Sequence, residues 1–223
     1  MINKENIFYE IDLFFQNYFE NKKIVTGDIR KISSLSFKEI EEKELNNILE
    51  LSEILLEKRK WKYEVIAYDW AFRIKSQYNK DTFYIFEDWL QKYVDDWGNC
   101  DDFCTHAFGE LIAQHNDLFK KVLEWVDHKD FWVRRAAAVI LIYPIRKNRL
   151  GDISPYIISD KLMNDDHYLV LKGYGWMLKE LSKYKNKEVY DYIRKNKAKM
   201  PRLSLRYAIE HFEKDVKKEL MKK

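Results

Sequence analysis

Apolar residues recur at steps of three and four along almost the whole chain. One such run is Ile7, Ile11, Phe14, Phe15, Tyr18 and Phe19, and another is Leu45, Ile48, Leu49 and Leu55. This spacing gives an α-helix one apolar face, whereas a half-buried strand would alternate. The pattern therefore predicts an all-α protein. We expect further helices at about 61–78, 80–94, 100–115, 117–127, 130–147, 152–163, 166–184, 187–196 and 203–220.

Short polar segments separate these helices, which makes successive helices antiparallel neighbours. Asp130 and Ser204 stand where a side-chain oxygen can cap a first helical turn. One segment also returns along the chain, since Phe-Trp-Val-Arg-Arg-Ala at 131–136 is echoed by Tyr-Leu-Val-Leu-Lys-Gly at 168–173. A separation of roughly 40 residues is typical of HEAT-class helix pairs, which bury their apolar faces by stacking. The sequence therefore predicts a curved solenoid with a concave groove.

The composition agrees with long helices and short turns. The chain has only 6 Gly and 3 Pro, and 35% of its residues are charged. No stretch approaches the ~18 uncharged apolar residues of a membrane span, and the N-terminus carries acids where a secretory signal needs bases. We therefore expect a cytoplasmic protein that does not enter a membrane. Cys100 and Cys104, one helical turn apart, are expected to be free thiols.

The positive charge is concentrated toward the C-terminus. The net charge is +3, but residues 183–223 hold 14 basic and 6 acidic side chains, while residues 1–60 hold 10 and 12. Clustered Lys and Arg favour a polyanionic partner such as DNA, because binding releases counterions from the phosphates. A solvated C-terminal helix would explain the same charges.

A stretch from Asp95 to Phe103 gathers four carboxylates around a tryptophan at a predicted helix start. Asn99 could cap this helix, and Asp101 would then lie near the positive end of the helix dipole, which favours its ionised form. Trp97 lies one turn before Asp101. These residues suit a catalytic carboxylate, although by themselves they favour the plainer alternative, with Asp101 as part of a cap and Trp97 as a core residue.

Two later stretches carry basic residues beside small ones. Arg134 and Arg135 lie roughly 100° apart around a helix, so only one of them can face a groove. The echo pairs Arg135 with Lys172. Between Lys172 and Lys179, two glycines each cost about 1 kcal/mol in a helix, so we expect another backbone or a ligand to approach closely there, beside Trp176. Surface arginines and a core tryptophan are the plainer alternatives.

In order and spacing, four elements together resemble the AlkD-type DNA alkylation repair glycosylases. The elements are Trp97, Asp101 and Gly109; Trp132, Arg135, Ala136 and Ala137; Gly175 to Lys179; and Leu203, Ser204, Arg206, Ala208 and Ile209. The resemblance covers about residues 60–212, whereas residues 1–59 lack the N-terminal signature of the family. We treat residues 1–223 as a single HEAT-like domain with a divergent N-terminal part.

The resemblance implies hydrolysis of the N-glycosidic bond of cationic N3- or N7-alkylated purines in duplex DNA, leaving an abasic site without strand cleavage. Such a base leaves without a general acid, so no cofactor or metal is expected. The resemblance gives catalytic roles to Asp101, Trp97 and Trp176. DNA-binding side chains are then expected at Arg135, Lys172, Lys179, Arg202 and Arg206. Because duplex DNA would occupy the concave face, we expect a monomer.

Two other functions fit the same residues. The divergent N-terminal part is compatible with a non-catalytic protein that binds DNA structures on the same scaffold. Helical-repeat proteins can also be adaptors that bind other proteins in their grooves. The affinity of such an adaptor for DNA should depend little on salt concentration. A zinc site at Cys100, Cys104 and His106 is not expected, because no further ligand pair completes it.

Overall fold

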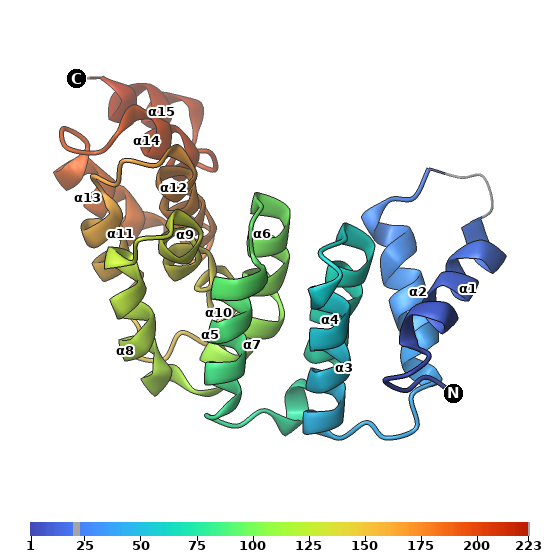
Figure 1. Ribbon diagram of the computed structural model, residues 1–223. Coiled ribbons are helices and arrows are strands. Elements are labelled where there is room, and N and C mark those ends of the chain that lie inside the picture. Colours follow the sequence, from blue (N-terminus) through green and yellow to red (C-terminus); the bar gives the residue numbers. More distant parts are fainter. Residues whose placement is uncertain (20–22, 223) are drawn as a thin grey trace. The chain divides into compact units, whose positions relative to one another are not determined.

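The computed structural model describes residues 1–19 and 23–222, and the chain in these ranges is built from helices joined by short connections (Figure 1). The extended pairing in the described residues is a single bridge between Ile2 and Ile40. The predicted all-α helical-repeat fold is thus confirmed. The chain divides into two compact units, Met1–Tyr93 and Val94–Lys223, so whether it acts as the single domain expected above stays a prediction.

The first unit consists of paired helices. Its elements are α1 (Ile7–Phe19), α2 (Thr26–Lys38), α3 (Leu45–Glu57), α4 (Trp61–Arg73), η1 (Lys75–Gln77) and α5 (Thr82–Tyr93). Helix α4 packs against both α2 and α3 and contributes the buried Tyr68 and Trp70. Asp69 of the same helix is almost buried and pairs with Arg30 and Arg73. The apolar residues of these helices therefore form a core, and the buried charge of Asp69 is paired.

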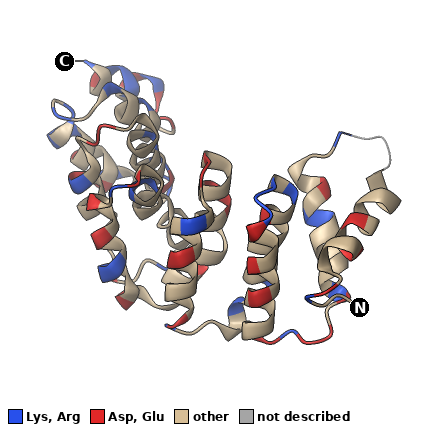
Figure 2. Ribbon diagram, in the orientation of Figure 1, with Lys and Arg blue, Asp and Glu red and all other residues tan. Residues whose placement is uncertain are grey.

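The second unit carries the elements singled out in the sequence. It contains α6 (Trp97–Thr105), α7 (Ala107–Gln114), η2 (Asn116–Leu118), α8 (Phe119–Val122), η3 (Leu123–Asp127), α9 (Phe131–Val139), α10 (Ile142–Arg146), α11 (Pro155–Leu162), α12 (Tyr168–Ser182), α13 (Asn186–Asn196), α14 (Arg202–Ala208) and α15 (Lys214–Met221). Helix α12 is central, with α9 and α14 packed against it, and α6 packs against α9. Figure 2 shows Lys and Arg positions along the C-terminal helices of this unit.

The internal echo corresponds to equivalent helix starts. Helices α9 and α12 begin at the two echoed positions, and each has a side-chain N-cap, Asp130 and His167. Three polar contacts between neighbouring repeats then span the same 34 residues of sequence, from Arg135 to Asp101, from Arg135 to the Leu169 carbonyl and from Arg146 to Glu180. The repeat is therefore present in the contacts as well as in the sequence.

Several of the predicted helices are interrupted. The expected helix 100–115 breaks at His106, whose backbone is not helical, and 203–220 divides into α14 and α15. The helix expected at 130–147 divides before α10, where Pro144 has no amide hydrogen to donate to the preceding turn. Ser204 does not cap its helix, because α14 already begins at Arg202 and Ser204 is buried inside it.

Gly175 is a point of close contact between α12 and α14. A methyl group at this position would lie 2.8 Å from both the Ser204 carbonyl oxygen and the Tyr207 Cβ. The close approach expected beside the two glycines is thus made by a neighbouring helix.

We expect Gly175→Ala to lower the free energy of unfolding by about 2 kcal/mol, because α14 would have to move, and denaturant titration measures this. The matched control is Gly27→Ala in α2, where a methyl group meets nothing within 4 Å. It should stabilise by up to about 1 kcal/mol through helix propensity. Equal effects of the two substitutions would contradict the packing explanation.

Within the described residues, no helix is long and apolar enough to cross a membrane.

Candidate functional site

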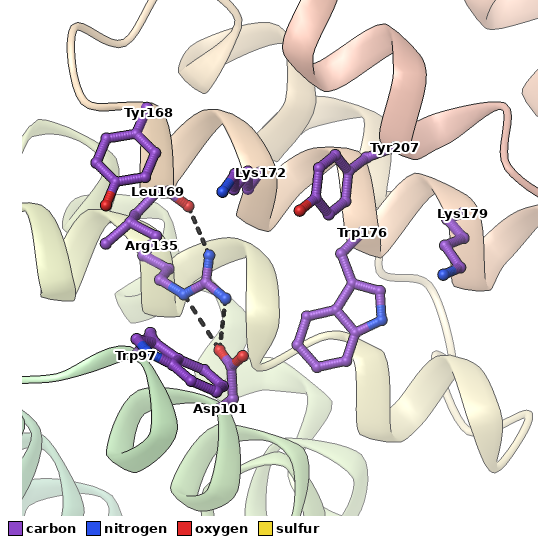
Figure 3. Close-up of a pocket in the computed structure, with 9 residues that line it drawn as sticks. All are labelled: Trp97, Asp101, Arg135, Tyr168, Leu169, Lys172, Trp176, Lys179 and Tyr207. Atoms are coloured by element: carbon purple, nitrogen blue, oxygen red, sulfur yellow. Dashed lines mark hydrogen bonds and ion pairs between the residues drawn. The ribbon is translucent and has the colours of Figure 1, made fainter.

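The second unit contains a pocket of about 440 Å³ formed by α6, α9, α12 and α14. Figure 3 shows its lining: Trp97, Asp101, Arg135, Tyr168, Leu169, Lys172, Trp176, Lys179 and Tyr207. The three side chains expected to be catalytic and three of the five expected to bind DNA therefore line one pocket. The catalytic and DNA-binding roles of these side chains stay predictions.

Helix α6 presents Trp97 and Asp101 to the pocket. Its N-cap is Asp96, whose Oδ1 accepts a hydrogen bond from the Asn99 amide at 2.9 Å, so Asn99 is not the cap expected from the sequence. Trp97 is the first helical residue and is 65% exposed. Asp101 consequently lies in the second turn, where the dipole of the helix end acts on it more weakly.

Asp101 is held by Arg135 of α9. Both Arg135 Nε and Nη2 donate to Asp101 Oδ1, at 3.1 and 2.6 Å, while Nη1 donates to the Leu169 carbonyl at 2.6 Å. In Figure 3 the other carboxylate oxygen of Asp101 lies on the side of Trp176. Only 5% of Arg135 is exposed. The arginine is thus committed to the protein, and its geometry favours orienting Asp101 over a free contact with phosphate.

Gly173 of α12 makes room for this arginine. A methyl group there would lie 3.3 Å from Arg135 Cγ, closer than most side chains approach, and in ordinary contact with Nη1 at 3.5 Å. Like Gly175, this helical glycine is therefore explained by packing within the protein. The guanidinium is fixed between α6, α9 and the first turn of α12.

Burial raises the pKa of the Asp101 carboxyl, and the charge and hydrogen bonds of Arg135 oppose this rise without cancelling it. The sequence-based expectation that the helix end keeps Asp101 ionised therefore does not describe the main effects. Arg135 is the group that favours the carboxylate, and Asp101 takes up a proton at a higher pH than an exposed aspartate does.

Two aromatic side chains and two lysines complete the pocket wall. Lys172 Nζ lies 5.0 Å from the ring centre of Tyr168 and 6.0 Å from that of Tyr207. In the described part of the chain no carboxylate forms an ion pair with it. Lys179 pairs with Glu210 at 2.7 Å. Lys172 is therefore the more available of the two cations for a phosphate.

Sequence reasoning missed Tyr168, Leu169 and Tyr207. A signal for the first two existed, because they open the echoed segment at the positions of Phe131 and Trp132. Tyr207 lies inside the fourth family element, but nothing in the sequence indicated that α14 turns this ring toward α12.

Arg202 and Arg206 do not line the pocket. Arg202 donates to the Met221 carbonyl at 2.8 Å, and Arg206 is exposed. Because α14 directs Tyr207 to the pocket, its neighbours on the helix point elsewhere. The DNA-binding roles expected for these two arginines stay predictions. Arg134 is held in ion pairs with Asp165 and Asp166, which agrees with the expectation that only one of the two adjacent arginines faces the groove.

The two cysteines belong to α6, like Asp101, but do not line the pocket. Cys100 and Cys104 are buried and free, and burial raises the pKa of the Cys104 thiol, which keeps it protonated. Among the residues that the structure describes, no three His, Cys, Asp or Glu side chains are grouped so that they could hold a metal ion.

Known proteins share this sequence pattern and this fold. A family model for the DNA alkylation repair enzymes matches residues 4–212, which includes most of the N-terminal part where no signature was recognised. Among solved structures, a predicted DNA alkylation repair enzyme from Enterococcus faecalis matches with a TM-score of 0.71 at 15% identity, covering 95% of this chain and 97% of its own. At this identity the likeness concerns the fold. No curated protein matches the chain.

Proposed function

Since the chain belongs to the DNA alkylation repair enzyme family, we propose that it is a DNA glycosylase acting on N3- or N7-alkylated purines in duplex DNA. It would hydrolyse the N-glycosidic bond and leave a free base and an abasic site. The observation that supports this most is the position of Asp101 in the pocket. It is an oriented, partly buried carboxylate, and Trp97 and Trp176 line the same pocket.

The proposed reaction needs few catalytic groups from the protein. An N3- or N7-alkylated purine is already cationic, so it departs with the electron pair of the glycosidic bond and needs no proton. Positive charge then develops on the sugar, where the Asp101 carboxylate stabilises it. Water adds to C1′, and its proton passes to Asp101 or to solvent. The faces of the two tryptophans add to the stabilisation, because aromatic faces attract cations.

The exposed rim of the pocket suits a nucleotide that stays near the surface of the duplex. Trp97 is 65% exposed and Tyr168 is 54% exposed, so the site is not enclosed as a deep base-binding pocket would be. Lys172 would contact a phosphate beside the lesion and set the register. We further propose that the protein acts as a monomer in the cytoplasm.

The test is release of free base from a duplex carrying one N7-methylguanine or N3-methyladenine under single-turnover conditions. We expect release with the strand intact until alkali cleaves the abasic site. Matched duplexes with unmodified purine or with uracil, an uncharged leaving base, should be inert. No release combined with salt-sensitive binding would instead favour a non-catalytic DNA binder, and binding that ignores salt would favour an adaptor.

A further inference from the structure

The indole nitrogen of Trp176 is held by a carboxylate outside the pocket. In Figure 3 the six-membered ring of Trp176 lies on the side of Asp101, and its nitrogen lies on the opposite side. Trp176 Nε1 donates a hydrogen bond to Glu180 Oε1 at 3.2 Å, one turn further along α12. Glu180 is 3% exposed and does not line the pocket. The pocket tryptophan is therefore anchored by a buried acid.

Glu180 is kept ionised by two cations. Its Oε2 accepts from Arg146 Nε at 3.1 Å and from Lys183 Nζ at 2.9 Å. Burial acts to raise the pKa of Glu180, but these two partners outweigh it and lower the pKa to about 2. The acceptor of the indole hydrogen bond is thus a full negative charge over the whole range in which DNA remains duplex.

An anionic acceptor affects the indole in two ways. It fixes the rotation of the ring, since a hydrogen bond to a charged group is about twice as strong as a neutral one. It also polarises the N–H bond and moves electron density into the ring, which strengthens the attraction between the ring face and a cation. The Arg146 guanidinium lies 5.7 Å from the same ring and would act in the opposite sense, but Glu180 pairs with it.

We propose that Glu180 is a positioning residue for the reaction, acting through Trp176. It holds the indole so that an electron-rich face meets the positive charge that develops on the sugar. This inference rests on the proposed glycosylase function and adds to it a residue that lies outside the pocket.

The first test compares Glu180→Gln with a matched control. Glu110→Gln replaces another buried carboxylate of the same unit, which pairs with Arg149 at 2.9 Å and does not line the pocket. We expect Glu180→Gln to slow single-turnover base release roughly ten-fold and to leave DNA affinity within roughly two-fold. Glu110→Gln should leave both unchanged.

A shortened acid separates the indole contact from the ion pairs. Glu180→Asp keeps the negative charge near Arg146 and Lys183 but withdraws it from the indole nitrogen. We expect this variant to retain more thermal stability than Glu180→Gln and to release base equally slowly. If Glu180→Asp instead restores the parent rate, the ion pairs alone matter and the proposal is wrong.

A double-mutant cycle tests whether Glu180 acts through Trp176. Trp176→Phe keeps an aromatic face but has no N–H, so adding Glu180→Gln to it should change the rate less than about two-fold. Full additivity of the two effects would overturn the proposal. The indole ¹H–¹⁵N resonance of Trp176 should also move upfield in Glu180→Gln and stay in place in Glu110→Gln. An inactive parent would refute the glycosylase function, whereas an active parent with an unchanged Glu180→Gln rate would refute only the role of Glu180.

Discussion

Replacing Asp101 with asparagine is expected to lower the single-turnover rate of base release at least ~100-fold. Asparagine has nearly the same shape, and its amide oxygen can still accept the two hydrogen bonds that Arg135 donates. What is lost is the negative charge that would stabilise the oxocarbenium-like sugar. DNA affinity should stay within a few-fold, because in the proposed complex Lys172, and not the carboxylate, contacts a phosphate.

The control for this substitution is Asp102→Asn. Asp102 is the next residue of α6 and interacts with His106 at 3.1 Å, so it tests for a general loss of negative charge from the helix. We expect the control to release base at nearly the parent rate. Release by Asp101→Asn within about ten-fold of the parent would remove Asp101 from its catalytic role.

The substitution Arg135→Gln is expected to change the pH dependence of base release. Burial raises the pKa of Asp101 and Arg135 restrains that rise, so removing the arginine lets the pKa climb further. The reaction needs the carboxylate. The parent rate should therefore fall as the pH is lowered through the raised pKa, and in Arg135→Gln this fall should begin at a higher pH. We also expect a loss of about 3 kcal/mol in stability, because a buried pair is broken.

Rate profiles from about pH 5 to 9, recorded well below the melting temperature of the variant, measure this shift. Arg149→Gln serves as the control, since Arg149 pairs with Glu110 away from the pocket. The contrary result would be unchanged pH profiles in both variants, with weaker DNA binding by Arg135→Gln and a smaller dependence of its DNA affinity on salt. It would mean that Arg135 binds phosphate and does not orient Asp101.

Much of the site could be predicted because the repeat places equivalent residues at equivalent points. Arg135 and Lys172 occupy the same position of successive echoed segments, and both line the pocket. Trp176 lies one turn after Lys172, so the helical period brings it to the same wall. The helices themselves followed from apolar spacing, because a stacked repeat buries one face of each helix.

The rest depends on which helix lies against which. Glu180 looks in the sequence like an ordinary surface charge beside Lys179, and only the structure, in which α12 packs against α10, shows that it is buried. Gly175 signals a close approach without naming its partner, which is α14. The helix break at His106 and the turn between α14 and α15 arise from packing that no local pattern records.

The constant spacing of the contacts that build the site also has a consequence for biosynthesis. The hydrogen bonds that Arg135 donates to Asp101 and to the Leu169 carbonyl each span 34 residues of sequence. A chain emerging from the ribosome can therefore close them only in order, and Tyr207 joins the pocket last. Until α9 emerges, the growing chain exposes an aspartate without its arginine, together with the surface of α6 that later packs against α9. Nascent chains of this kind are most prone to misfolding before the next repeat has emerged, because the apolar surface that it will cover is still exposed.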